Sequence, residues 1–130
     1  MSNHEALAAE LYRALAAGDR TTLTEILHPD FTGQITAGMP LDLGGTYTGA
    51  DDMRRNFWGT LARHFHARAE PESMHPLVDG GLLVIGRYTG TARTGGELDA
   101  AFAHLLRFDG ERVIMLRQFT DTLRWARALE

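Results

Sequence analysis

The sequence contains no cysteine. Disulfides, thiolate nucleophiles and cysteine-based zinc sites are therefore excluded. The absence also fits a cytoplasmic location, which is the one that we expect, because cytoplasmic proteins do not depend on disulfides.

The sequence also lacks the features that membrane proteins, secreted proteins and nucleic-acid-binding proteins require. No apolar run reaches the length of about 18 residues needed to span a membrane, and the first residues lack the basic start and apolar middle of a signal peptide. The formal net charge is −4, whereas nucleic-acid binding needs a concentrated basic face. We therefore expect neither a membrane nor a nucleic acid as a partner.

The composition is that of an ordinary globular chain. Hydrophobic residues make up 44% and charged residues 23% of 130 residues, which suits one domain over residues 1–130. Such a chain builds its core without a metal or disulfide.

The first half of the chain has the pattern of three helices. Ser2 and Glu5 have the spacing of a capping box, Gly18 is a natural helix stop, and Asp19 can cap a second helix that Pro29 closes. A strand is expected over 31–36 and a glycine-rich loop over 37–49. The third helix begins near 51–52, and its apolar stripe comprises Met53, Phe57, Leu61 and Phe65.

The second half has the pattern of strands. Residues 67–78 are weakly patterned, whereas β-forming residues fill 82–93, 98–108 and 112–120, and 122–130 fit a short terminal helix. Helices followed by an antiparallel sheet give an α+β order. We expect a strongly bent sheet around the helices, a cone whose inner face is lined by alternate strand residues.

Two turns compete in the last hairpin. A two-residue turn at Asp109-Gly110 pairs Phe108 with Glu111, whereas a three-residue loop with Gly110 in a bulge pairs Arg107 with Glu111. A shift of one residue exchanges the two faces of the strand.

We favour the three-residue loop because of the face that it creates. It places His104 and Gln118 among apolar side chains, whereas the other register places Arg117 in the middle of that surface. The last strand is also apolar on its other face, so we expect a second subunit to cover the outside of the sheet. The inward face then comprises Phe102, His104, Leu106, Ile114, Leu116 and Gln118.

Three parts of the sequence carry a family resemblance. They are the helix end at 15–19 with the segment up to Phe31, the run 44–49 leading to Phe57-Trp58, and the ending over 104–121. Together they resemble SnoaL-like domains of the nuclear-transport-factor-2-like class. The resemblance implies a cone-shaped α+β barrel, with N-terminal helices packed in the concave face of a strongly curved, mixed, mostly antiparallel sheet, and an apolar pocket.

The class includes SnoaL-type polyketide cyclases, ketosteroid isomerases, limonene epoxide hydrolases and non-catalytic members. The resemblance places His104 at the pocket histidine of the cyclases and Gln118 at their catalytic aspartate. The main isomerase tyrosine falls at Leu11, with Tyr12 one residue out of register, and Arg87 matches the epoxide-hydrolase arginine. The cyclase and isomerase machinery is therefore absent in its standard form.

His104 and Gln118 are the predicted catalytic residues. Histidine exchanges protons near neutral pH, and an amide can orient a ligand or hold the histidine tautomer. We expect Arg87 to point inward and stabilise negative charge; pointing outward, it would be a surface or interface charge. Asp121 is a weaker catalytic candidate because strand parity turns it away from Gln118. The predicted pocket wall comprises Trp58, Arg87, Phe102, Leu106, Leu116, Tyr47 and Phe57.

These residues predict a cofactor-free pocket protein without a metal. His64 and His66 do not share a helix face, so they do not form a metal site. The leading function is an isomerase or cyclase that uses acid/base chemistry on an apolar cyclic or polyketide-like substrate. The alternatives are a non-catalytic ligand-binding or dimeric assembly module and an epoxide-hydrolase-like activity. We expect a small apolar ligand and a homodimer.

Overall fold

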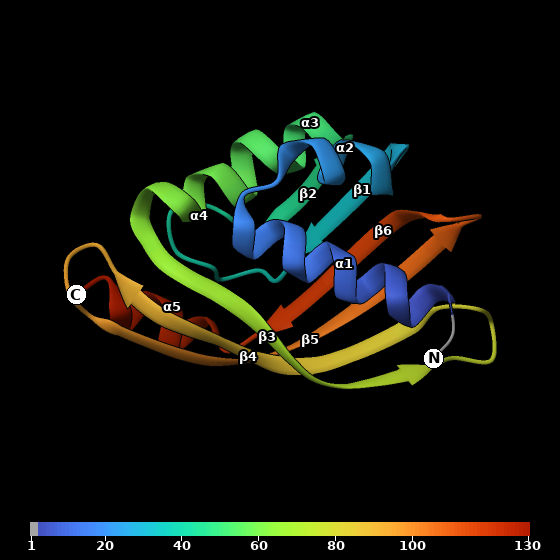
Figure 1. The fold of residues 1–130 in the computed structure, drawn as a ribbon. Helices are drawn as coiled ribbons and strands as arrows, with labels where there is room; N and C mark the ends of the chain where they lie inside the picture. Colours follow the sequence, from blue (N-terminus) through green and yellow to red (C-terminus); the bar gives the residue numbers. More distant parts are fainter. Residues whose placement is uncertain (1–2) are drawn as a thin grey trace.

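Four helices lie against the concave side of a curved six-stranded sheet (Figure 1). The computed structural model describes residues 3–130, so the predicted cap at Ser2 lies outside the described residues. The expected cone-shaped α+β fold is confirmed, and its sheet stays open, with β2 and β3 at the two edges of the described part.

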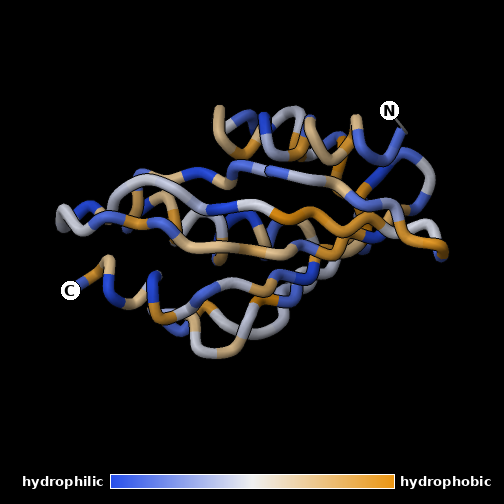
Figure 2. The backbone as a smooth tube through the Cα atoms, turned by 90° about the horizontal axis from the view of Figure 1, so that it is seen from below, coloured by the Kyte–Doolittle hydropathy of each residue, from blue (hydrophilic) through white to orange (hydrophobic). Residues whose placement is uncertain are grey.

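The first helix ends and the second begins where the sequence predicts, whereas the second ends at Ile26, before the predicted stop at Pro29. Helix α1 spans Asn3–Ala17 and helix α2 spans Arg20–Ile26. Gly18 between them adopts a left-handed φ of +65°, a conformation that favours glycine at helix ends. In Figure 2, α1 alternates between hydrophilic and hydrophobic along its turns, as expected for a helix with one buried face.

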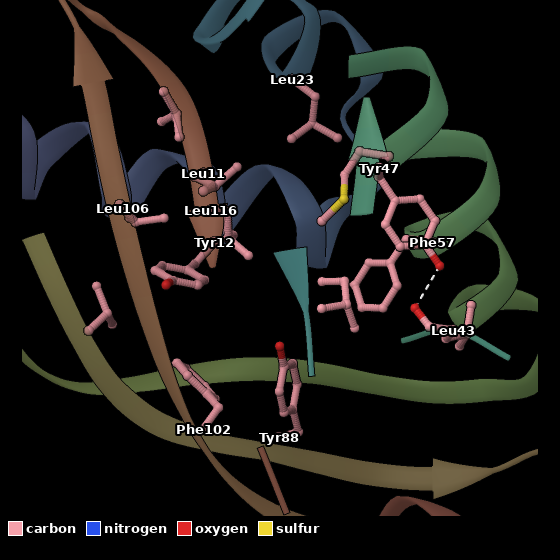
Figure 3. Packing of buried hydrophobic residues seen from close by; sticks show 14 of the residues in the cluster. Leu11, Tyr12, Leu23, Leu43, Tyr47, Phe57, Tyr88, Phe102, Leu106 and Leu116 are labelled. Carbon is pink, nitrogen blue, oxygen red and sulfur yellow. Dashed lines mark hydrogen bonds between the residues drawn. The ribbon is translucent and has the colours of Figure 1, made fainter. Parts of the chain in front are cut away.

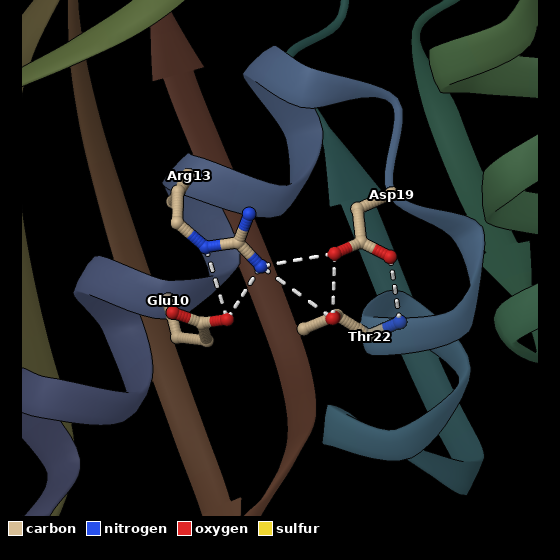
Figure 4. A network of polar contacts seen from close by, with 4 residues as sticks. All are labelled: Glu10, Arg13, Asp19 and Thr22. Carbon is tan, nitrogen blue, oxygen red and sulfur yellow. Dashed lines mark hydrogen bonds and ion pairs between the residues drawn. The ribbon is translucent and has the colours of Figure 1, made fainter.

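A polar network joins the two helices on their exposed side (Figure 4). The carboxylate of Asp19 accepts hydrogen bonds from the backbone nitrogen and hydroxyl of Thr22, and Arg13 bonds both Glu10 and Asp19. These bonds, above all the one from the Thr22 hydroxyl, lower the pKa of Asp19 to about 2. Asp19 is therefore a charged N-cap across the physiological pH range.

The third helix consists of three consecutive segments. They are α3 (Ala50–Asp52), the π-helical segment η1 (Met53–Trp58) and α4 (Gly59–His64). The backbone nitrogen of Gly59 donates to the carbonyl of Arg54, five residues earlier. Such wider turns are frequent at functional sites, and this one ends at Trp58, on the inner side of the cone.

The strands form one mixed sheet in the order β2-β1-β6-β5-β4-β3. Strands β1 and β6 run parallel, and the other neighbours are antiparallel. Three strands depart from the predicted bounds. β1 begins four residues early and includes Pro29, β2 lies within the predicted loop, and β3 begins at Phe65, which was predicted to belong to the third helix. The strands are β1 (Leu27–Ile35), β2 (Gly45–Thr48), β3 (Phe65–Pro76), β4 (Leu82–Ala92), β5 (Glu97–Asp109) and β6 (Arg112–Thr120), followed by helix α5 (Thr122–Ala128).

The turn of the last hairpin differs from the prediction. Asp109 pairs with Arg112, which leaves Gly110 and Glu111 as the two turn residues. Gly110 supplies a φ of +61° at the first of these positions. The predicted pairing of Arg107 with Glu111 is therefore wrong, because the glycine starts the turn instead of forming the bulge after it.

The predicted faces of this hairpin are nevertheless correct. A register shift leaves Ile114 without a partner in the ladder, and His104 lies directly opposite Gln118. The unpaired Ile114 shifts the register by one residue. This shift compensates for the one-residue difference in the turn, so the side chains keep their predicted faces. His104 and Gln118 therefore both point into the cone, where each is at most 3% exposed.

Candidate functional site

A cavity lies between the helices and the inner face of the sheet. Its volume is about 120 Å³. Ala16, Ala62 and Arg68 line its outer part and are exposed, whereas Tyr88 and Gln118 line its inner part and are buried. The remaining lining side chains are mostly apolar: Leu15, Phe57, Trp58, Leu61, Phe65, Ala67, Ala69, Leu116 and Trp125, together with His104.

The inner end of this cavity is polar because of His104. The hydroxyl of Tyr12 lies 2.8 Å from Nδ1 of His104, and the hydroxyl of Tyr88 lies 2.7 Å from Nε2. Both ring nitrogens are thus hydrogen-bonded to tyrosines from different elements, α1 and β4. Figure 3 shows the hydroxyl of Tyr88 pointing away from its strand and into the interior.

Gln118 extends the same chain of hydrogen bonds. Its Nε2 donates to the hydroxyl of Tyr88 at 2.8 Å. Its carbonyl Oε1 is buried and has no hydrogen-bond partner among the described residues. A buried carbonyl without a partner is costly, so this atom is a natural point of contact for a ligand.

Burial sets the charge of every group at this end. It lowers the pKa of His104 to about 3 and raises the pKa values of Tyr12 and Tyr88 above their ordinary range. The ring and both hydroxyls are therefore neutral at physiological pH. The arrangement can donate and accept hydrogen bonds without carrying a net charge.

The strand registers explain how these side chains meet. His104 in β5 lies opposite Val84 in β4 on one side and Gln118 in β6 on the other. Phe102 stacks on the His104 ring with 4.0 Å between ring centroids. Gly86 makes room for that stack, since a Cβ there would lie 2.7 Å from Cζ of Phe102.

Five of the residues that the sequence singled out line the cavity. Three more, Phe102, Leu106 and Tyr47, are buried in the core but do not line the cavity. The hydroxyl of Tyr47 donates to the backbone carbonyl of Leu43 (Figure 3). The five lining residues are Phe57, Trp58, His104, Leu116 and Gln118.

Two predicted residues lie elsewhere. Arg87 is on the outer face of β4, where it forms an ion pair with Asp99 at 2.6 Å, so the inward orientation that we expected is wrong. Its neighbour Tyr88 takes the inward position, because buried residues alternate along the strand through Gly86 and Tyr88. Asp121 caps helix α5 by accepting from the backbone nitrogen of Arg124.

Sequence reasoning missed Tyr12 and Tyr88 as site residues. Tyr12 belongs to the buried face of α1, and the family comparison placed it one residue out of register. The signal for Tyr88 was available, since it continues the buried alternation of Leu82, Val84 and Gly86. The prediction that Arg87 points inward placed the opposite face of β4 toward the core.

Within residues 3–130, no three histidine, aspartate or glutamate side chains are grouped so as to hold a metal ion. His64 ends helix α4 and His66 lies in β3, and both are exposed. None of the helices in this range is long and apolar enough to cross a membrane.

Comparison with known proteins gives a consistent result. The family model described as SnoaL-like domain matches residues 8–115. An NTF2-like protein from Burkholderia thailandensis is 30% identical, with a TM-score of 0.86 over 100% of this chain and 99% of that one. An NTF2-like protein of unknown function from Burkholderia pseudomallei is 27% identical, with a TM-score of 0.88 over 99% and 98%.

A third structure shares the fold at lower identity. TerC, co-crystallised with polyporic acid, is 19% identical, with a TM-score of 0.88 over 98% of each chain. No curated protein matches the sequence.

Proposed function

The chain belongs to the SnoaL-like domain family, and from this premise we propose that it is a small-molecule pocket protein with cofactor-free acid/base chemistry. Its ligand is an apolar cyclic or polyketide-like molecule. One observation carries the proposal: a mostly apolar cavity ends at the hydroxyl of Tyr88 and the amide of Gln118. Such a cavity, with few convergent polar groups, is typical of sites for small ligands.

The size of the cavity supports a ligand with a single buried ring. Its volume is about 120 Å³, and an apolar cavity of roughly 150 Å³ is known to hold benzene. A larger ligand would extend through the outer part, past Ala16, Ala62 and Arg68. TerC, which shares the fold, was crystallised with a small molecule, polyporic acid.

The chemistry that the polar end supports is stabilisation of negative charge on a carbonyl oxygen. A neutral tyrosine hydroxyl in a water-poor site is an effective donor to an oxygen that gains charge during enolisation, isomerisation or aldol-type cyclisation. In this proposal Tyr88 contacts the ligand oxygen. His104 and Gln118 position that hydroxyl, so His104 does not transfer the proton itself. The proton that leaves the ligand carbon passes to a water molecule in the exposed outer part of the cavity, and water returns a proton to the product carbon.

A non-catalytic binding module is the second candidate, and one observation favours it. No aspartate or glutamate lines the cavity within residues 3–130, so a carboxylate base is not provided there. The epoxide-hydrolase-like alternative loses its support, because Arg87 pairs with Asp99 outside the cavity and Asp121 caps a helix.

We also propose that the protein is a homodimer through the outer face of the sheet. Neighbouring strands place Ile85, Ala103 and Phe119 in one row on that face. Ile85 and Ala103 are only partly covered, and Phe119 is 47% exposed. An apolar surface of this kind favours a partner subunit.

Two measurements test the proposed function. Acetophenone added to the ¹⁵N-labelled protein should shift amide signals of the cavity lining, and Ala69→Phe should remove these shifts by filling the cavity. Isomerisation of cyclohex-3-enone to the conjugated cyclohex-2-enone, followed by absorbance, tests the chemistry. Binding without any rate increase would support the binding module, and absence of cavity binding would contradict both candidates.

A further inference from the structure

Four buried side chains form one hydrogen-bonded chain that ends at the cavity. It runs from Tyr12 through His104 and Tyr88 to Gln118, with distances of 2.8, 2.7 and 2.8 Å. The directions of its hydrogens determine what the cavity offers to a ligand.

The neutral ring of His104 carries a single N–H. One tyrosine must therefore donate to the bare ring nitrogen, and the other must accept from the protonated one. Either Tyr88 donates to Nε2 and Nδ1–H donates to Tyr12, or Tyr12 donates to Nδ1 and Nε2–H donates to Tyr88.

The surroundings of the two tyrosines distinguish these arrangements. Tyr12 is 5% exposed, does not line the cavity, and its hydroxyl has no hydrogen-bond partner other than His104 among the described residues. If it accepted from His104, its own hydrogen would be buried without an acceptor, which is unfavourable. Tyr88 does line the cavity, so its hydrogen can reach a ligand.

Tyr12 therefore donates to Nδ1, and Nε2–H of His104 donates to Tyr88. The oxygen of Tyr88 then accepts two N–H groups, one from His104 and one from Gln118. Because both acceptor positions of this oxygen are occupied, its own hydroxyl hydrogen points in the remaining direction, into the cavity. Accepting two hydrogen bonds also polarises this hydroxyl and makes it a stronger donor.

Gln118 adds an acceptor beside this donor. Its side chain lines the cavity, is 1% exposed, and leaves Oε1 without a partner. Because its amide nitrogen is 2.8 Å from the Tyr88 oxygen, the donor and the acceptor lie at the same end of the cavity.

We propose that this donor–acceptor pair selects a ring ligand that carries both a carbonyl oxygen and a hydroxyl group. The carbonyl oxygen accepts from Tyr88, and the hydroxyl donates to Oε1 of Gln118. The inference rests on the proposed function, since it requires that the cavity binds a small molecule. Tyr12 and His104 are positioning residues that direct the Tyr88 hydrogen.

Three probes of nearly equal size test the pairing. They are 3-hydroxyacetophenone, 3-methylacetophenone, which lacks the hydroxyl donor, and 3-ethylphenol, which lacks the carbonyl acceptor. We expect the first to bind at least about tenfold more tightly than either of the others, as measured by NMR titration, because each analogue leaves one buried group unpaired. Equal affinities of the hydroxyl and methyl compounds would overturn the pairing. The proposed function would still stand, whereas no binding of any probe would contradict that function itself.

A variant of Gln118 tests whether this residue causes the preference for 3-hydroxyacetophenone over 3-methylacetophenone. Gln118→Leu should bring 3-hydroxyacetophenone and 3-methylacetophenone to similar affinities. Gln34→Leu, which changes an exposed glutamine of β1, should leave the difference unchanged. Retained discrimination in Gln118→Leu would contradict the role of its carbonyl.

A third measurement needs neither a ligand nor a variant. Long-range ¹H–¹⁵N correlation of the imidazole ring reports which nitrogen of His104 is protonated. We expect the Nε2–H tautomer at neutral pH. The Nδ1–H tautomer would turn the Tyr88 hydrogen toward the ring and overturn the proposal.

Discussion

The hydroxyl of Tyr12 lies 2.8 Å from Nδ1 of His104, although the two residues are 92 positions apart in the sequence. This contact joins the first helix to the middle strand of the last three. It occupies the ring nitrogen that faces away from Tyr88, and burial keeps the ring neutral. In the proposed function, His104 is therefore a fixed support for Tyr88 and not an exposed acid or base.

Removing the Tyr88 hydroxyl tests the group that contacts the ligand. Tyr88→Phe should weaken 3-hydroxyacetophenone binding by about 1–2 kcal/mol, roughly a tenfold change, because one hydrogen bond in a buried site is lost. Tyr47→Phe removes another buried hydroxyl, one that bonds the Leu43 carbonyl outside the cavity. It should leave the affinity unchanged by NMR titration, and equal losses in both variants would point to a general effect on the fold.

Gly86 is closely packed between the Phe102 ring, which stacks on His104, and the backbone of Glu70. Gly86→Ala would bring a Cβ against the backbone carbonyl oxygen of Glu70 and to 2.7 Å from the Phe102 ring, and such overpacking should lower the free energy of unfolding by about 2 kcal/mol or more. Gly18→Ala is the comparison, since φ there is +65° but the space around it is open. It should cost about 1 kcal/mol. Urea unfolding followed by circular dichroism measures both, and a milder effect at position 86 than at 18 would contradict the packing argument.

The pH dependence of stability follows from the low pKa of His104. In the folded protein this pKa is about 3, below the ordinary value of 6.5, so between these values the unfolded chain binds one more proton at this site. Above pH 6.5 the ring is neutral in both states, and His104 does not change the free energy of unfolding with pH. As the pH drops from 6.5 toward 3, His104 lowers the free energy of unfolding by about 1.4 kcal/mol per pH unit.

Urea unfolding between pH 7.5 and 4.5 checks this dependence. His104→Gln should flatten the profile, whereas His64→Gln, at an exposed position, should retain it. Identical slopes in the wild type and His104→Gln would show that the ring is not held neutral in the fold.

Substitutions on the outer face of the sheet test the proposed homodimer. Phe119→Arg places a charge beside Ile85 and Ala103 and should convert the proposed dimer into a monomer, because burying an unpaired charge in an apolar interface is unfavourable. Leu123→Arg, at a 58% exposed position of α5, should remain dimeric. Size-exclusion chromatography with light scattering measures both, and a monomeric wild type would refute the dimer.

Local chemistry in the sequence was sufficient for the junction of the first two helices and for the inward face of the last hairpin. Asp19 caps α2 and Gly18 ends α1 because caps depend on neighbouring residues alone. The alternation of apolar residues was also enough to place His104 and Gln118 inside the cone, even though the turn itself was predicted wrongly.

Tertiary structure alone decided what surrounds His104. The direction of Arg87 or Tyr88 depends on which face of β4 meets the core, and a one-residue choice exchanges the two. The contact of Tyr12 depends on where α1 lies across the sheet, which no local pattern specifies. The sequence by itself therefore determined that a histidine and a glutamine enter an apolar interior. Only the packing of α1, β4 and β6 around them placed the hydroxyl of Tyr88 at the end of the cavity.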